Sequence, residues 1–203
     1  MDELLKLAID GHGGARRWAQ LSGFRAGVCV SGAIWDAAGQ AGLLEGVVLE
    51  GPTAVPRLTI TPVPRPGLRA TWEPGRQIIE TAGWSWFTAP FVFAREDFAA
   101  EETWPWREDG EVWRALLVTY PDPVAAQHRQ QTCYFDRAGL LRRLDCQAGI
   151  LGGGAAVHYP SCYREFGGIM VPTRRRVHPR GPDGLPLRDT VSLAVDVSFV
   201  TFW

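Results

Sequence analysis

The stretch VHYPSCYREFGGIMVPTRRRVH, residues 157–178, decides the fold because it has the form of a β-hairpin. Gly167-Gly168 stands at its centre, between two extended segments at 157–166 and 169–178. Consecutive glycines favour the two-residue turns that need positive φ at both central positions, and such turns join antiparallel strands. The stretch therefore predicts two neighbouring antiparallel strands.

The same turn predicts a register, because residues that flank a two-residue turn lie opposite each other in an antiparallel pair. Phe166 is then opposite Ile169, and the further pairs on that face are Arg164 with Val171, Cys162 with Thr173, Pro160 with Arg175, and His158 with Val177. This face is mostly apolar and is expected to be dry, since alternate residues share a face. The opposite face is expected to be wet, because it carries Glu165, Arg174, Arg176, Tyr159 and Tyr163.

Similar signals occur along the rest of the chain. Two more hairpins are predicted at Asp109-Gly110 and at residues 136–139, and period-two alternation predicts strands at 24–30 and 191–199. Shorter strand candidates are residues 43–50, 57–63, 68–73 and 76–80. Helical spacing predicts two short helices within residues 2–21, separated by Gly11-His12-Gly13-Gly14, and a third helix near residues 88–98.

These elements predict a mainly β (α+β) fold. A curled antiparallel sheet of about 9–11 strands would form an open half-barrel, because a sheet of that length does not stay flat. Residues 1–203 are expected to form a single domain, with residues 1–22 as a helical lid and residues 23–203 as the sheet.

The composition excludes several classes of protein. Of the 203 residues, 46% are hydrophobic and 21% are charged, and a formal net charge of −1 gives no general attraction to nucleic acid. No stretch is long and apolar enough to span a bilayer, and the start of the sequence lacks a secretory signal, so a cytoplasmic location is expected. The cysteines contain no C-x-x-C pair and no phosphate-binding motif is present, so we expect free thiols, no metal and no cofactor.

Several segments carry a resemblance to a known family. They are His12-Gly13-Gly14 with Trp18 nearby, and residues 31–35, 108–114, 134–143 and 164–176. Together they resemble an uncharacterised bacterial family of proteins without signal peptides. The hairpin series is similar to the LolA-type lipoprotein-carrier fold, an antiparallel half-barrel over a hydrophobic cavity, and also to the half-barrel enzyme of the violacein pathway. Leu144, Cys146, Cys162 and Tyr163 depart from the family's pattern, which implies a specialised descendant.

The candidate site residues follow from the predicted inner face. His158 is the candidate catalytic acid or base, because it is the inward residue that titrates near neutrality. Ligand-binding candidates are Trp72, Trp104, Trp106, Cys146, Cys162 and Thr173. The tryptophans would form an aromatic wall, with Trp104 and Trp106 on one strand face, and a glycine turn centred at 153–154 would place Cys146 opposite Cys162. His12 would either cap a helix C-terminus or face the mouth of the cavity.

Two functions remain open from the sequence. In the first, the half-barrel binds a hydrophobic or aromatic small molecule and cyclises or isomerises it without a cofactor, as in secondary-metabolite biosynthesis. In the alternative, the protein is a non-catalytic carrier of a lipid or another apolar ligand. The sequence leaves the oligomeric state open.

Overall fold

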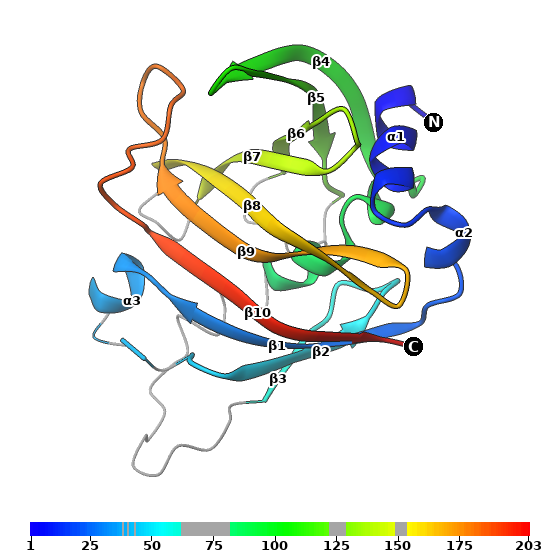
Figure 1. Ribbon diagram of the computed structural model, residues 1–203, viewed down its shortest axis with the longest axis horizontal. Helices are drawn as coiled ribbons and strands as arrows, with labels where there is room; N and C mark the ends of the chain where they lie inside the picture. The colour runs from blue at the N-terminus through cyan, green and yellow to red at the C-terminus, as the bar shows by residue number, and fades with distance from the viewer. Residues whose placement is uncertain (38, 40, 43, 62–81, 122–128, 149–153) are drawn as a thin grey trace.

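Ten antiparallel strands form one curled sheet in the computed structural model of the chain (Figure 1). The structure describes residues 1–203 except 38, 40, 43, 62–81, 122–128 and 149–153. Within the described residues the strands are β1 (Gly23–Ser31), β2 (Val47–Pro52), β3 (Thr59–Thr61), β4 (Ala99–Glu108), β5 (Glu111–Thr119), β6 (Gln130–Phe135), β7 (Leu141–Ala148), β8 (Gly154–Phe166), β9 (Ile169–Pro179) and β10 (Leu193–Phe202). The predicted fold class is confirmed: the protein is mainly β, with an open antiparallel sheet and a few short helices.

The sheet order is β3-β2-β1-β10-β9-β8-β7-β6-β5-β4. Strands β4 to β10 follow one another as a meander, and β1 joins this meander to β2 and β3 by pairing with β10. The two open edges are the short strand β3 and the long strand β4. The strand candidates at 68–73 and 76–80, and with them Trp72, lie outside the described residues.

The predicted hairpins are present, and their turn residues explain why. Gly167 and Gly168 have φ angles of 58° and 89°, and Asp109 and Gly110 have φ angles of 49° and 81°. Two successive positive φ angles are the signature of the turn whose twist matches that of the flanking strands. In the β8–β9 hairpin, the predicted pairs Phe166–Ile169, Arg164–Val171, Pro160–Arg175 and His158–Val177 are confirmed.

One residue of that hairpin breaks the predicted alternation. Cys162 has a φ of 54° and does not form the predicted ladder pair with Thr173, whose hydroxyl instead donates a hydrogen bond to the Cys162 carbonyl. A residue in this left-handed conformation re-aims its neighbours in a strand. Cys162 is consequently exposed, whereas Tyr163, predicted on the wet face, packs its ring edge against His12 at a centroid distance of 5.7 Å.

The predicted opposition of Cys146 and Cys162 is wrong. Cys146 pairs with Ala156, six positions before Cys162, and Ala148 pairs with Gly154. A run of glycines allows several turn positions, so it does not by itself fix the register of β7 on β8. The two cysteines do lie on neighbouring strands, and all four cysteines of the chain are free.

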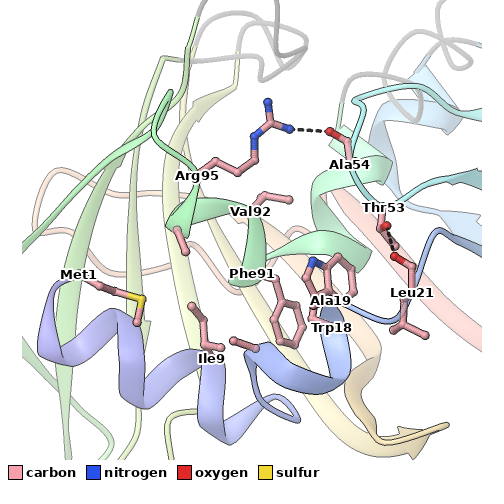
Figure 2. A pocket seen from close by; sticks show the side chains of 12 residues that line it. Met1, Ile9, Trp18, Ala19, Leu21, Thr53, Ala54, Phe91, Val92 and Arg95 are labelled. Carbon is pink, nitrogen blue, oxygen red and sulfur yellow. Dashed lines mark hydrogen bonds between the residues drawn. The ribbon is translucent and has the colours of Figure 1, made fainter.

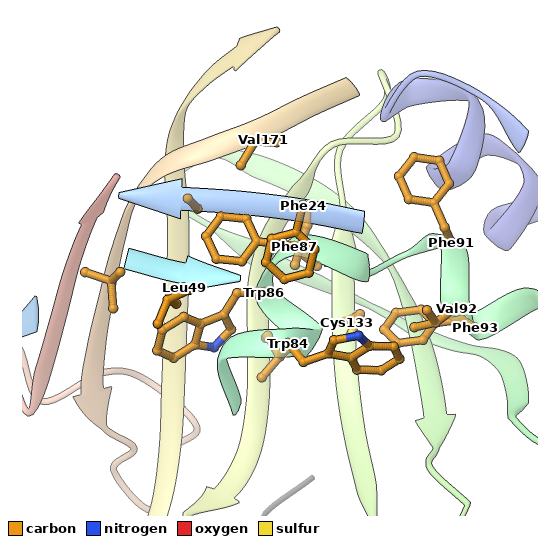
Figure 3. Close-up of a cluster of buried hydrophobic side chains, with 14 of the residues drawn as sticks. Phe24, Leu49, Trp84, Trp86, Phe87, Phe91, Val92, Phe93, Cys133 and Val171 are labelled. Atoms are coloured by element: carbon orange, nitrogen blue, oxygen red, sulfur yellow. The ribbon is translucent and has the colours of Figure 1, made fainter. Parts of the chain in front are cut away.

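The concave side of the sheet is filled by residues 82–94, which precede β4. Residues 82–88 are helical, and a 3-10 helix, η1 (Phe91–Ala94), follows. Figure 3 shows Trp84, Trp86, Phe87, Val92 and Phe93 from this segment among the strands, and Phe91 pointing toward the N-terminal helices. One helix was predicted near 88–98, whereas the structure has a helix at 82–88 and the 3-10 helix η1. These two helices occupy the interior that the N-terminal helices were expected to cover.

The N-terminal helices dock at one end of the half-barrel (Figure 1). In α1 (Glu3–Gly11), Asp2 caps the first turn, and Leu4, Leu5, Ala8 and Ile9 are buried. The backbone N–H of Met170 donates to the His12 carbonyl at 3.0 Å, and Nε of Arg17, in α2 (Ala15–Trp18), donates to the Gly167 carbonyl at 2.6 Å. The helices are thus fastened to the β8–β9 turn. A third helix, α3 (Ala33–Ala37), was not predicted and follows β1.

Candidate functional site

A groove of about 530 Å³ lies between the N-terminal helices, η1 and the segment after β2 (Figure 2). Its lining consists of Met1, Ile9, Ala15, Trp18, Ala19, Leu21, Thr53, Ala54, Phe91, Val92, Ala94 and Arg95. The volume falls within the range of about 300–1,000 Å³ that is usual for small-molecule sites. Segments distant in the sequence build this groove, which is why local periodicity did not reveal it.

Aromatic stacking shapes the wall of the groove. The ring of Trp18 lies parallel to that of Phe91, with centroids 4.2 Å apart and an interplanar angle of 4°, and Phe202 meets Trp18 edge-on. A stacked pair of this kind is rigid and presents flat apolar surface. The helical spacing of Trp18 and Leu21 is the one sequence signal that pointed toward this wall.

Two polar side chains that line the groove, those of Thr53 and Arg95, are hydrogen-bonded within the protein. The Thr53 hydroxyl donates to the Leu21 carbonyl at 2.7 Å, and Nη1 of Arg95 donates to the Ala54 carbonyl at 2.6 Å (Figure 2). Arg95 also forms a bidentate pair with Asp97. The surface that remains for a ligand is therefore mainly apolar, with Arg95 as the only charged side chain among the residues that line the groove.

A second, smaller cavity of about 40 Å³ lies on the concave side of the sheet, under the helix at 82–88. It is lined by Ala82, Ser85, Trp86, Ala89, Tyr120, Gln131, Leu141, Leu144, Cys146, His158 and Arg175. The inward placement of His158 and Cys146 agrees with the sequence analysis. A space of this size holds about three water-sized groups and no aromatic ligand.

His158 and Cys146 interact directly within this cavity. His158 Nε2 lies 3.4 Å from Cys146 Sγ. Burial, and then the charge of Arg175, lowers the pKa of His158 to about 3, while burial raises the pKa of Cys146 to about 12. Both groups are neutral at pH 7, and a histidine with so low a pKa is poorly matched to proton transfer near neutrality.

Four of the predicted ligand-binding residues, Trp104, Trp106, Cys162 and Thr173, do not line the cavity around His158. Trp104 is 89% exposed, and an irregularity in β4 between Thr103 and Trp106 separates it from Trp106. Trp106 packs on the outer face, where its indole N–H donates to Glu108. Cys162 is exposed and Thr173 is only half-buried, and the expected opposition of Cys146 and Cys162 is not formed. Trp72, the third tryptophan of the expected wall, lies outside the described residues, so its part in a wall stays a prediction.

The outer face of the sheet holds a buried ion network that the sequence analysis missed. Arg143 has no exposed surface; it donates to Glu108 at 2.6 Å and to Asp145 at 2.7 and 2.9 Å. Arg180 and Arg188 reach the same carboxylates, and the Gly184 carbonyl accepts from Arg143. Arg143 also lies over the Trp106 ring at 4.4 Å. Because each buried charge is paired, we interpret the network as structural.

Two absences hold for the described part of the chain. It contains no group of three or more His, Cys, Asp or Glu side chains arranged to hold a metal ion. It also contains no helix long and apolar enough to cross a membrane.

Comparison with solved structures shows the same arrangement of the sheet. A LolA superfamily protein from Nitrosomonas europaea superposes with a TM-score of 0.56 at 14% identity, covering 98% of this chain and 92% of the other. The fold is LolA-like. A domain from Vibrio parahaemolyticus, described as an outer membrane lipoprotein-sorting protein, superposes with a TM-score of 0.50 at 10% identity, covering 98% and 91%. No family model matches the chain, and no curated protein matches its sequence. The LolA-like resemblance expected from the hairpins is thus confirmed at the level of the fold.

Proposed function

We propose that this LolA-like protein binds an apolar ligand, the acyl chain of a lipid, in the groove between α1, α2 and η1. The observation that carries the proposal is a mainly apolar groove of about 530 Å³ in which the Thr53 hydroxyl and the Arg95 guanidinium are already hydrogen-bonded within the protein. A saturated acyl chain matches such a surface, because its binding is driven by the burial of apolar area and it forms no hydrogen bonds. The name of the Vibrio domain, which refers to lipoprotein sorting, supports an acylated ligand.

We favour binding without catalysis, which the sequence analysis gave as the alternative to a cyclase or isomerase. The groove offers one charged side chain, Arg95, which is already paired with Asp97. The cavity around His158 is too small for the aromatic substrate considered above, and both His158 and Cys146 stay neutral at pH 7. A cytoplasmic location remains part of the proposal, to be tested by cell fractionation.

The test is a titration of the protein with a fluorescent fatty acid, 11-(dansylamino)undecanoic acid. Ala19 is exposed and lines the groove, so Ala19→Phe fills the groove without disturbing buried packing. We expect at least a tenfold weaker Kd, which corresponds to about 1.4 kcal/mol. Ala37→Phe, an exposed alanine at the end of α3, is the matched control and should bind as the unmodified protein does.

Equal affinities for Ala19→Phe and Ala37→Phe would show that the groove is not the binding site. Extraction of the purified protein, followed by mass spectrometry and NMR spectroscopy of the extracted compound before and after incubation with the protein, separates the two functions. Because isomerisation leaves the mass unaltered, only a compound whose mass and NMR spectrum are both unchanged supports the carrier. A compound converted by the protein would contradict the proposal and restore the cyclase or isomerase.

A further inference from the structure

Arg175 is a cation buried inside the half-barrel that has no counter-ion among the described residues. Its side chain comes from β9, its residue is 6% exposed, and its Nη1 has no hydrogen-bond partner. No carboxylate of the described residues forms an ion pair with it. By contrast Arg143, equally buried on the other face of the sheet, is held by Glu108 and Asp145.

The groups that surround Arg175 do not balance its charge. The acidic groups that interact with it include the phenols of Tyr120 and Tyr163 and the thiols of Cys133 and Cys146. Burial raises the pKa of each of these four groups, so all are neutral at pH 7. The ring of Trp86 lies 5.8 Å from the guanidinium carbon and offers only the weak negative potential of an aromatic face. A buried charge in this setting is costly unless an anion joins it.

His158 directs a second unsatisfied group into the same cavity. Its Nδ1 is buried and has no partner, whereas its Nε2 lies 3.4 Å from Cys146 Sγ. We assign the neutral Cys146 thiol as the donor to Nε2, and the ring proton of the neutral imidazole then lies on Nδ1. The free Nδ1 is then a donor, like the free Nη1 of Arg175.

We propose that the cavity of about 40 Å³ beneath the 82–88 helix binds a carboxylate group, held by Arg175 and His158. A carboxylate has three heavy atoms, which fits a space for about three water-sized groups. Its two oxygens accept from a guanidinium in the bidentate manner, and its charge neutralises Arg175. The group belongs either to a small free carboxylate, such as formate, or to the head of a longer fatty acid. This site is distinct from the acyl groove and does not depend on it.

The test measures the melting temperature of the protein as sodium formate is added at constant ionic strength, with chloride as the balancing anion. A ligand that binds only the folded state raises Tm in a saturable way. We expect such a rise for the unmodified protein and none for Arg175→Met, which keeps the apolar stem and removes the charge. Arg174→Met is the matched control, because Arg174 is exposed on the opposite face of the same strand; it should retain the full rise.

The stability of Arg175→Met without formate and the formate affinity of His158→Phe provide two further tests. Without formate, Arg175→Met should melt no lower than the unmodified protein, since the substitution removes an uncompensated buried charge. If Arg175→Met does not fold, His158→Phe, which removes the Nδ1 donor, should shift the formate midpoint at least fivefold upward. A comparison of dodecanoate with dodecanol, which has the same chain but no carboxylate, identifies the source of the carboxylate. A saturable rise in Tm with dodecanoate but not with formate or dodecanol, lost in Arg175→Met, assigns the carboxylate to a fatty-acid head.

Two outcomes would overturn the proposal. A cavity filled by water only would give no saturable rise in Tm with either carboxylate. An equal rise in Arg174→Met and Arg175→Met would show that the carboxylate does not bind at Arg175.

Discussion

His12 illustrates how a single side chain joins a helix to the core. Its Nδ1 lies 2.8 Å from the Ala8 carbonyl, its backbone N–H closes the end of α1, and its ring meets Phe135 and Tyr163 edge-on. The residue is 3% exposed. Of the two roles left open by the sequence, the structure confirms the helix cap. Burial, the dominant influence, lowers the pKa of His12 to about 4.

This lowered pKa predicts a dependence of stability on pH. The unfolded chain binds a proton at His12 near pH 6.5, whereas the folded protein resists protonation until about pH 4. Stability is therefore full above pH 6.5 and falls as the pH decreases toward 4, by as much as about 3 kcal/mol from His12 alone. Urea unfolding at pH 7 and at pH 4.5 measures the loss. His158, whose pKa is also lowered, adds a loss of the same sign.

Substitution separates the contribution of His12 from that of other groups. His12→Gln keeps a donor and an acceptor but cannot titrate, so the difference in unfolding free energy between the two pH values should shrink. His178, which is more exposed and contacts the Thr190 carbonyl, provides the control His178→Gln. An unchanged pH difference in His12→Gln would show that its ring already carries a proton in the folded state.

At the scale of the element, the turns were predicted and the irregularities were not. The two-residue turn between β8 and β9 needs positive φ at both positions, which Gly167 and Gly168 adopt without strain. This turn therefore determined the register of β8 on β9 and the inward position of His158. The left-handed Cys162 has no local sequence signature, because a re-aimed residue is stabilised by the neighbouring strand. The irregularity beside Trp104 contains Pro105, which cannot donate to the ladder, so a sequence signal was present there but was not used. The groove and the Arg175 cavity need contacts between distant segments, which periodicity does not supply.

The docking of the N-terminal helices on the β8–β9 turn predicts that alanine substitutions at two neighbouring glycines reduce stability by different amounts. Gly13 has a φ of 121°, and a Cβ there would collide with the Gly168 carbonyl oxygen. Gly14 also has a positive φ, 85°, yet a Cβ there meets nothing within 4 Å. Gly14→Ala should therefore cost only backbone strain, about 1 kcal/mol, whereas Gly13→Ala should cost about 2 kcal/mol more from overpacking. Equal losses in thermal unfolding would refute this docking.

At the scale of the molecule, we propose that residues 1–203 unfold as one unit. One hydrophobic cluster runs without interruption from Leu4 and Ile9 in α1, through Trp84 and Phe87, to Val177 and Val195 in the last strands. A continuous core of this kind favours a cooperative transition. Urea unfolding followed by tryptophan fluorescence and by far-ultraviolet circular dichroism should give coincident midpoints. Separate midpoints would indicate that the helical lid unfolds independently of the sheet.

The position of β10 between β1 and β9 has a consequence for biosynthesis of the chain on the ribosome. Until residues 193–202 have been translated, β1 with its partners and β4 to β9 are two separate sheets, each with an unpaired edge where β10 belongs. Such edges pair readily with other nascent chains. The half-barrel can therefore close only after β10 leaves the exit tunnel, and until then both edges stay open to pairing with other chains.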